Sequence, residues 1–525
     1  MKKRSLLSLF LTLSLLMGAL AACAPATQQP AAPGGGTAAG QPAQNEGEAA
    51  GVGRGVTIAI DSETPTLAPG RHGSVHGHWK NIMTHNGLFR IAYNLQPVPD
   101  IVSDWRAISD TLFEFALHEG IMFHNGEELT AEDVAASFEY MRNFPEGAAQ
   151  RTAAQRVEAV DRYTFTIYTG TPNALLFTEL AHQANFILPK SFIDAGNDFN
   201  QNPIGSGPFV FDDWQFGNSL TFNRFDDYFD AGRTAMVEYI HWRVIPEGAS
   251  RTIALEIGEV DFVSHVAHPD IPRLQDSPDI TVTAIPGTRM FYMLFNHTLP
   301  QFQNVYFRRA IDMAIDRDAI VQGAFDGFGV PNVQQFPPDF RGSSAVGIRG
   351  YNPEGAVALL AEHGIDPASA GFEMIAIGEQ QRRRAEIIQA NLAEIGIPTT
   401  VSQIDLAGWF DLTNAGMHEA ALSTFTTNDL LTFLRSTVHT AAIGAMNWSH
   451  YSNPELDQLI DQAIMTIDVD ARHALLYDIS TRVNEEVIWI PTFMDLTIRA
   501  HNANLIQPEL AGNGFNFLNM VYWVE

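Results

Sequence analysis

The chain contains 525 residues, with 60 acidic against 31 basic side chains and a formal net charge of −29 at pH 7. Such an acidic surface repels phosphate groups, which argues against nucleic acid as a partner and against direct adsorption to anionic lipid. A single cysteine in the whole sequence rules out structural disulfides within the chain, so the fold depends on buried apolar surface.

Residues 1–22 are predicted to be an export signal. Basic residues at positions 2–4 precede an apolar run from Leu6 to Leu20, and two alanines follow at 21–22. The run is too short to favour a permanent membrane span. Its Leu-Ala-Ala-Cys ending resembles the lipobox of bacterial lipoproteins, which implies that Cys23 is acylated and becomes the mature N-terminus. The alternative is an ordinary cleaved signal that carries an unrelated cysteine.

The next segment, residues 23–55, is rich in alanine, proline, glycine and glutamine and has very few aliphatic side chains beyond alanine. Such a composition buries too little apolar surface to offset the entropy of ordering the backbone. We therefore expect a disordered tether between the lipidated Cys23 and a folded part that starts near residue 56.

The folded part is expected to have an α/β architecture of two or three lobes. Alternating, β-branched patterns predict strands over 56–60, 164–168, 241–245 and 291–295. Capping residues, Asn-Pro starts and glycine stops predict helices after Thr130, Asn352 and Asn453, and a further amphipathic helix before Gly396.

Several stretches resemble motifs of one family. The segment FEFALHEGIMFHNGEELTAEDVAASFEYMR, from Phe113 to Arg142, resembles the signature of the family 5 extracellular solute-binding proteins, which are peptide and nickel receptors of ABC importers. Stretches that begin at Pro203, Trp242 and Phe295 are similar to later motifs of that family, in the family's order. The resemblance covers nearly all of the folded part but does not identify the solute.

The resemblance implies a two-lobed periplasmic-binding-protein-like clamp of the class II type, with an extra inserted subdomain. Closure about two connecting strands, near 286–291 and 488–493, would bury the solute between the lobes. The implied boundaries are 56–90, 203–285 and 492–525 for lobe I, 91–202 for the inserted subdomain and 286–491 for lobe II.

The stretch LSTFTTNDLLTFLR is the expected ammonium-binding region of lobe II. In peptide-binding relatives an aspartate there pairs with the peptide ammonium, and alignment on Phe433 puts that position at Thr426. A free ammonium would then need Asp429 or another carboxylate. The hydroxyl of Thr426 and the amide of Asn428 would also suit an oligosaccharide, or could simply belong to a solvent-facing strand end.

Four histidines between residues 72 and 85 raise the possibility of a transition-metal site. Neighbouring rings two residues apart point in different directions, so only His72 and His76 form a plausible helical pair. No metal site is therefore expected, and loop or helix-start roles are the default. Trp79, beside them, is a candidate for stacking on the solute or for packing in the core.

Further ligand-binding candidates are His76, Asn447 and Trp448, the last two immediately before the Asn453 helix start, and Arg289 beside the first expected hinge. An amide beside a flat ring could fix a peptide backbone or a sugar, whereas the alternative is a turn whose tryptophan only packs. Arg289 could pair with a solute carboxylate or hold the lobes together.

The sequence contains no G-x-S-x-G, H-E-x-x-H or P-loop motif and no cysteine in the folded part, so a secreted hydrolase is only a remote alternative. We expect a monomeric, extracytoplasmic, lipid-anchored receptor without a cofactor. It would capture a peptide-like solute for an ABC permease and its ATPase, with an oligosaccharide or a metal chelate as alternative solutes.

Overall fold

The computed structural model describes residues 54–71, 75–144, 152, 154–338, 340–507, 514 and 518–524. The predicted export signal, Cys23, all but the last two residues of the predicted tether, and His72 lie outside these residues. The chain from Ala50 onward forms one unit, and the fold below refers to its described part.

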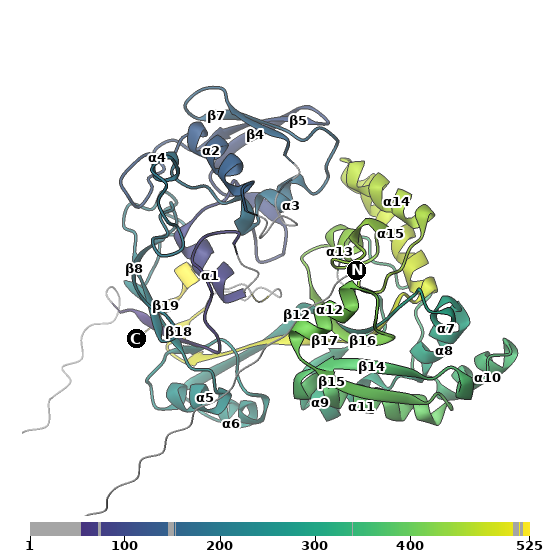
Figure 1. Cartoon of the computed structure of the whole chain (residues 1–525). Coiled ribbons are helices and arrows are strands. Elements are labelled where there is room, and N and C mark those ends of the chain that lie inside the picture. The colour runs from purple at the N-terminus through teal and green to yellow at the C-terminus, as the bar shows by residue number, and fades with distance from the viewer. Residues whose placement is uncertain are drawn as a thin grey trace, which may run out of the picture. The chain divides into compact units, whose positions relative to one another are not determined.

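Two long antiparallel strands, β12 (Ile280–Phe295) and β17 (Trp489–Asn502), connect the two lobes of this unit. They lie side by side across the molecule in Figure 1 and belong to both halves of one mixed sheet. The register between the two strands shifts between Pro286 and Met290, inside the first expected hinge. The domain boundaries stay a prediction, and the names lobe I, inserted subdomain and lobe II are kept for the expected ranges.

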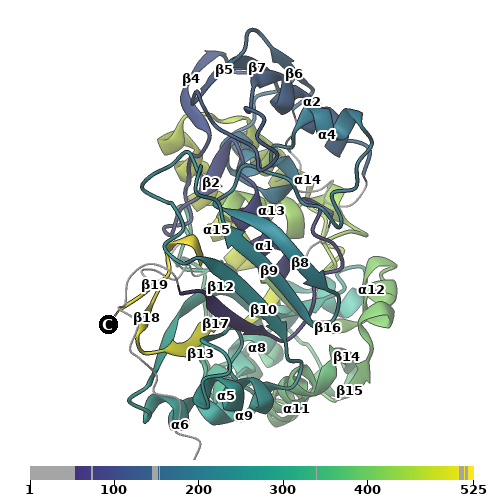
Figure 2. The same ribbon diagram turned by 90° about the vertical axis from the view of Figure 1, so that its left-hand side faces the viewer.

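Among the described residues the central sheet has 11 strands, in the order β15-β14-β16-β12-β17-β11-β1-β10-β9-β8, with β13 paired to β17. Figure 2 shows the lobe I end of this sheet, where β8, β9 and β10 lie side by side. Its other strands are β1 (Val56–Ile60), β8 (Phe209–Gln215), β9 (Ser219–Arg224), β10 (Tyr239–Val244), β11 (Phe262–Val263), β13 (Gly329–Pro331), β14 (Phe372–Ile377), β15 (Thr399–Ile404) and β16 (Ala420–Thr426).

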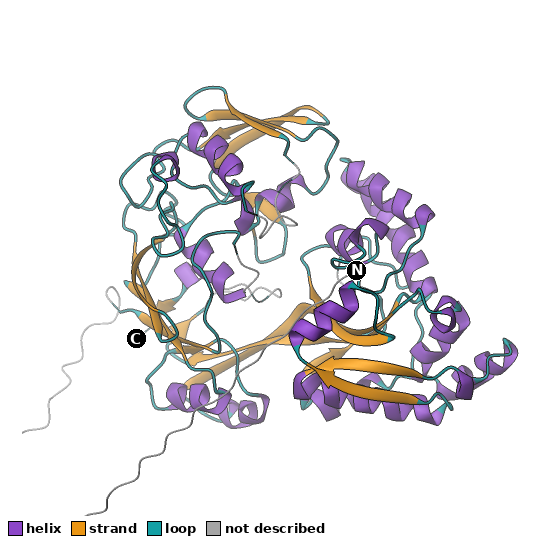
Figure 3. Cartoon of the chain, viewed as in Figure 1, coloured by secondary structure: helices purple, strands orange, loops and turns teal. Residues whose placement is uncertain are grey.

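In lobe II the sheet is covered on both faces, and the part of β12 inside this lobe, residues 290–295, is buried at every position. Successive residues of β12 alternate between two cores: Met293 and Phe295 join one, and Tyr292 and Leu294 join the other. Figure 3 shows the helices around these strands. They are α7 (Pro300–Gln303), α8 (Val305–Ala314), α9 (Arg317–Phe325), α10 (Pro353–Glu362), α11 (Gly378–Glu394), α12 (Leu406–Asn414), α13 (Leu430–Thr437), α14 (Pro454–Met465) and α15 (Val469–Glu486), with the short turns η3 (Pro367–Ser369) and η4 (Thr440–Ala442).

Lobe I packs α1 against one face of β1 and two helices against the other. Ile58 and Trp79 belong to the first core, whereas Ala59 and Leu255 belong to the second. The elements are α1 (Val75–Thr84), α5 (Gly248–Glu256), η2 (His268–Asp270), α6 (Ile271–Gln275), β18 (Leu505–Ile506), η5 (Leu518–Met520) and β19 (Tyr522–Trp523).

The inserted subdomain has its own antiparallel sheet, in the order β4-β5-β7-β6, and its own core. Its elements are β2 (Phe89–Ile91), β3 (Pro97–Pro99), β4 (Val102–Ser109), β5 (Leu112–Leu117), α2 (Ala131–Met141), β6 (Arg156–Ala159), β7 (Thr164–Tyr168), α3 (Leu176–Leu180), η1 (Gln183–Asn185) and α4 (Lys190–Asp194). None of the helices in the described part of the chain is long and apolar enough to span a bilayer.

The element predictions are confirmed. Strands β1 and β7 match the predicted ranges, β10 overlaps 241–245, and β12 contains 291–295. Helix α2 follows Thr130, whose backbone N–H donates to the Asp133 carboxylate at 2.8 Å. The side chains of Asn352 and Asn453 cap α10 and α14, as their Asn-Pro starts predict.

Candidate functional site

Two cavities lie beside the β12–β17 connection. The first, which we call the apolar cavity, has a volume of about 580 Å³ and lies between the inserted subdomain and lobe II. Loop 93–97 and α3 line one side, and residues 337–338, 340–341, 428–431, 472–473 and 476 line the other. Apolar residues, chiefly leucine, proline and phenylalanine, form most of its wall, with few charged groups, which is typical of a small-molecule site.

Asp429 is the acidic side chain in the lining of the apolar cavity. Its position is fixed because it caps α13: one carboxylate oxygen accepts the Thr432 N–H at 2.8 Å and the other accepts the Thr432 hydroxyl at 2.7 Å. Burial raises the pKa of Asp429, and the hydrogen bonds from Thr432 act in the opposite direction. A backbone hydrogen bond from Leu431 also reaches the carboxylate, whose two oxygens have about four lone-pair sites, so one site is left for a donor on a solute.

The second cavity, which we call the charged cavity, has a volume of about 470 Å³. Lobe I contributes Asp61, His76 and His265, and lobe II contributes Thr426. The connecting strands contribute charged residues from both β12 and β17, including Arg289, Asp495 and Arg499.

Arg289 and Thr426, two residues that the sequence singled out separately, are direct neighbours across β12 and β16. The guanidinium Nε of Arg289 lies 3.6 Å from Asp495 Oδ2, and 43% of the Arg289 side chain is exposed. Burial raises the pKa of Asp495, with Arg289 opposing that shift. Because this distance exceeds that of an ordinary hydrogen bond and the Arg289 side chain is nearly half exposed, Arg289 has N–H donors available to an incoming carboxylate.

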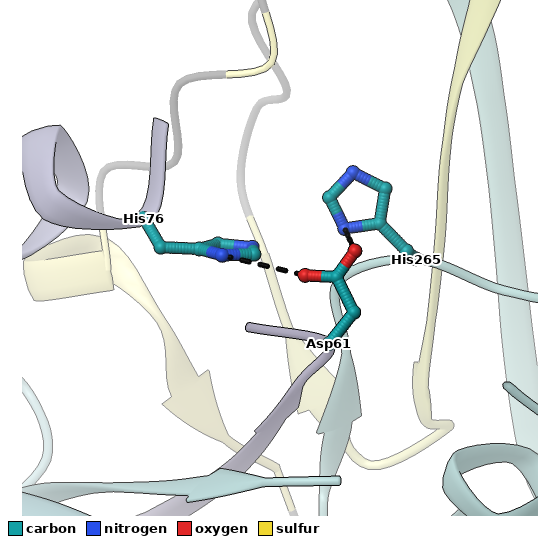
Figure 4. A group of neighbouring side chains, drawn as sticks. All are labelled: Asp61, His76 and His265. Atoms are coloured by element: carbon teal, nitrogen blue, oxygen red, sulfur yellow. Dashed lines mark ion pairs between the residues drawn. The ribbon is translucent and has the colours of Figure 1, made fainter. Parts of the chain in front are cut away.

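His76 meets two partners that come from distant parts of the sequence. Its Nδ1 lies 3.5 Å from Asp61 Oδ1, and His265 Nδ1 lies 3.7 Å from Asp61 Oδ2 (Figure 4). Burial lowers the pKa of His76 to about 4, although the Asp61 carboxylate opposes the shift, so the ring is neutral at pH 7. One ligand atom from each residue lies within 4.8 Å of the other two.

The histidine cluster seen in the sequence is divided by the fold. His78 and His85 line a separate cavity of about 270 Å³ next to Asp100 and Tyr228, away from His76. His72 lies outside the described residues. The pairing of His72 with His76, suggested by their helical spacing, therefore stays a prediction. The partners that the structure gives to His76, Asp61 and His265, could not be read from that spacing.

Three other candidates are held by contacts within the protein. Trp79 is fully buried and packs against Trp242 in the core beneath His76. The Asn447 amide is also buried, and it donates to three backbone carbonyls of its own loop, including that of Tyr451 at 2.9 Å. Trp448 donates from its indole nitrogen to Asn414 and packs on Trp409.

Sequence reasoning missed Asp61, His265, Asp495 and Arg499. A signal was present for the first two, because Asp61 directly follows β1, His265 comes two residues after β11, and ligand sites gather at the carboxyl ends of parallel strands. The pairing of β1 with β11 was needed to bring them together. The other two belong to β17, whose register against β12 the sequence did not show.

The inserted subdomain also touches lobe II directly. Arg435 Nη1 on α13 lies 3.0 Å from Glu179 Oε1 on α3. The backbone N–H of Ala174 donates to the Ile464 carbonyl at 2.7 Å, and Leu175 packs in a lobe II core. These contacts lie beside the apolar cavity and join the two sides of its wall.

Known proteins are similar along most of the chain. The matching family model describes bacterial extracellular solute-binding proteins, family 5 middle, and the match spans residues 96–444. The glutathione-binding protein GsiB of Salmonella paratyphi A is 25% identical over 487 residues, which cover 88% of this chain and 93% of the relative.

Solved structures have the same fold. HbpA2 from Haemophilus parasuis superposes with a TM-score of 0.80 at 23% identity, over 90% of this chain and 100% of that one. The periplasmic binding protein DppA from Helicobacter pylori, in complex with the peptide STSA, superposes with a TM-score of 0.76 at 22% identity, over 90% of this chain and 99% of that one. The two-lobed clamp expected from the sequence is thus confirmed.

Proposed function

Because this chain belongs to the bacterial extracellular solute-binding proteins of family 5, we propose that it captures a short peptide-like solute between its lobes and delivers it to the permease of an ABC importer. The observation that carries the proposal is the placement of opposite charges beside the β12–β17 connection. Asp429 lies in the apolar cavity, and Arg289 lies in the charged cavity.

These charges suit the two ends of a peptide. Arg289 is paired with Thr426 across two strands, and Asp429 follows Thr426 by three residues, so the Cα atoms of Thr426 and Asp429 lie at most about 11 Å apart. An extended peptide spans about 3.5 Å per residue, so a short one reaches this far. An unpaired terminal charge in a closed cleft would cost several kcal/mol. The charged groups therefore favour a peptide over a neutral oligosaccharide.

The relatives support the same class of solute. One is named for glutathione, a tripeptide that has one ammonium and two carboxylate groups, and another was solved with the peptide STSA. In this chain the carboxylates would meet Arg289, and the ammonium would meet Asp429. The rest of the solute would contact the apolar wall that α3 and α13 share.

The proposal describes a receptor that acts as a monomer and releases its solute unchanged. Attachment to the membrane is assigned to lipid on Cys23, because the Leu-Ala-Ala-Cys ending follows an apolar run of signal length. Two or more acyl chains hold a protein at a bilayer, whereas one does so only marginally. The extracytoplasmic side of the cytoplasmic membrane is then the place of capture.

The test starts with glutathione and a panel of dipeptides and tripeptides, ranked by the shift that each causes in thermal unfolding. The tightest peptide is then titrated calorimetrically, with a free and with an acetylated amino terminus. Asp429→Asn should weaken the affinity for the peptide with a free amino terminus about 10- to 100-fold, since hydrogen bonds to charged groups contribute about 1.5–3 kcal/mol. It should leave the affinity for the acetylated peptide unchanged.

This substitution has a built-in control for folding, because asparagine caps helices about as well as aspartate and α13 should be retained. Thr426→Ser serves as a matched variant that keeps the hydroxyl and the charge distribution. Equal effects of Asp429→Asn on both forms of the peptide would contradict the assignment of the ammonium. Turnover of the peptide, seen by mass spectrometry of the recovered solute, would contradict the receptor role itself.

A further inference from the structure

We propose that Asp61, His76 and His265 form a binding site for a divalent transition-metal ion in the wall of the charged cavity. The three residues come from three elements: the end of β1, the start of α1 and the loop after β11. The ion site does not depend on the solute being a peptide.

Strand register brings Asp61 and His265 together. Strands β1 and β11 are parallel neighbours, with Ile58 opposite Phe262 and Ala59 opposite Val263. The same register continued by two residues sets Asp61 opposite His265. Side chains that leave adjacent parallel strands at the same level start about 4.8 Å apart, which is the right spacing for two ligands of one ion.

The separations fit an ion better than direct hydrogen bonds. Asp61 lies 3.5 Å from His76 Nδ1 and 3.7 Å from His265 Nδ1, both longer than an ordinary hydrogen bond of about 2.7–3.2 Å. Ligands bound tetrahedrally at about 2.1 Å from Zn²⁺ lie about 3.4 Å from one another. The carboxylate in Figure 4 lies between the two rings, and one ligand atom from each of the three residues lies within 4.8 Å of the other two.

His76 gives a second, independent observation. The residue is only 4% exposed, and its Nε2 atom is buried without a hydrogen-bond partner in the part of the chain that the structure describes. The ring also has a backbone hydrogen bond with Ser62, and its Nδ1 atom lies 3.5 Å from both Ser62 Oγ and Asp61. A buried imidazole with an unpaired nitrogen is unusual, because buried polar atoms are generally satisfied.

The position of His265 is fixed by neighbouring arginines. Arg499 Nη1 donates to the Ser264 carbonyl at 2.6 Å, and Arg251 Nη2 donates to the His265 carbonyl at 3.1 Å. Both arginines are almost fully buried. The backbone on each side of the His265 side chain is therefore held, as expected for a ligand whose place must be set before the ion arrives.

Two imidazoles and one carboxylate are typical ligands for Zn²⁺, Ni²⁺ or Cu²⁺. Three protein ligands leave at least one coordination position open, toward a cavity of about 470 Å³. A carboxylate from the solute could occupy that position and also approach Arg289, which lines the same cavity. This last step rests on the proposed peptide-like solute, whereas the ion site itself does not.

The test uses the purified protein after removal of metal with a chelator. Calorimetric titration with Zn²⁺ and with Ni²⁺ should show one ion per chain. His265→Ala and His76→Gln should each weaken binding by tenfold or more, because even residues that only orient a ligand contribute about 10- to 100-fold. His363→Ala, on the exposed end of α10, is the matched control and should bind the ion as the parent protein does.

A second measurement does not depend on affinity or on perfect folding of a variant. Pulsed electron paramagnetic resonance of bound Cu²⁺ should count two coordinated imidazoles in the parent protein and one in His265→Ala. The proposal is overturned if no stoichiometric ion binds, if His265→Ala and His363→Ala have the same affinity, or if the copper spectrum shows no imidazole. None of these results would bear on peptide binding by Asp429, so the two proposals fail separately.

Discussion

The ion pair between Arg435 and Glu179 should help to hold the inserted subdomain against lobe II. The pair spans 3.0 Å, with 7% of the Glu179 side chain and 33% of the Arg435 side chain exposed. Glu179 also accepts the Asn173 amide at 2.9 Å, so loss of Arg435 would take the ion pair away from a buried carboxylate and leave this neutral hydrogen bond in place. Opening of the clamp between these elements would break the same contact.

The size of the effect follows from this burial. Exposed ion pairs contribute about 0–1 kcal/mol, whereas removing one partner of a fully buried pair costs about 3–5 kcal/mol. Because one-third of the Arg435 side chain is exposed, Arg435→Gln should destabilise the closed state, in which the inserted subdomain contacts lobe II, by about 2 kcal/mol. That energy changes the ratio of closed to open molecules about 30-fold.

Small-angle X-ray scattering of the free protein should show a larger radius of gyration for Arg435→Gln. The affinity for the tightest peptide of the panel should fall, by at most the same factor, because a solute that binds the closed state must restore it. The double variant Arg435→Gln/Glu179→Gln should recover part of the loss, since no unpaired carboxylate remains.

Arg482→Gln is the matched control, because its ion pair with Asp478 lies within lobe II and is about half exposed. If scattering and affinity are the same for Arg435→Gln as for Arg482→Gln, the reasoning is refuted. The Glu179 contact would then contribute nothing to the relative stability of the closed state.

Two further predictions concern the membrane anchor and acid stability. Cys23→Ala should move the protein from the membrane fraction to the soluble fraction with its solute binding intact, and a variant that stayed with the membrane would contradict lipidation at that residue. Burial, with Arg308 nearby, lowers the pKa of His297 to about 3, so between pH 5 and 6.5 the unfolded chain binds a proton there that the folded chain does not. The free energy of unfolding should therefore rise with pH in this window, by up to about 1.4 kcal/mol per pH unit for this residue. His297→Gln keeps a donor for the Ile488 carbonyl and should reduce that slope in urea unfolding, whereas an unchanged slope would show that His297 is not the group involved.

Local patterns in the sequence were sufficient to place many of the elements. Strand β1 is predicted from its alternating β-branched residues, and α10 and α14 from their Asn-Pro starts, because the physics of a cap or a pleat acts within a few residues. Ordered motifs over most of the folded part also indicated the family, which the match over residues 96–444 confirms.

Tertiary structure decided which side chains share a cavity. Arg289 and Thr426 became neighbours only through the register of β12 with β16, and Asp61 met His265 only through the register of β1 with β11. Only the tertiary structure shows that Trp79 and Asn447, plausible ligand residues by type, are fully buried. Sequence periodicity reports which face of an element is buried, but the neighbour across a sheet depends on pairings between residues hundreds of positions apart, which no local pattern records.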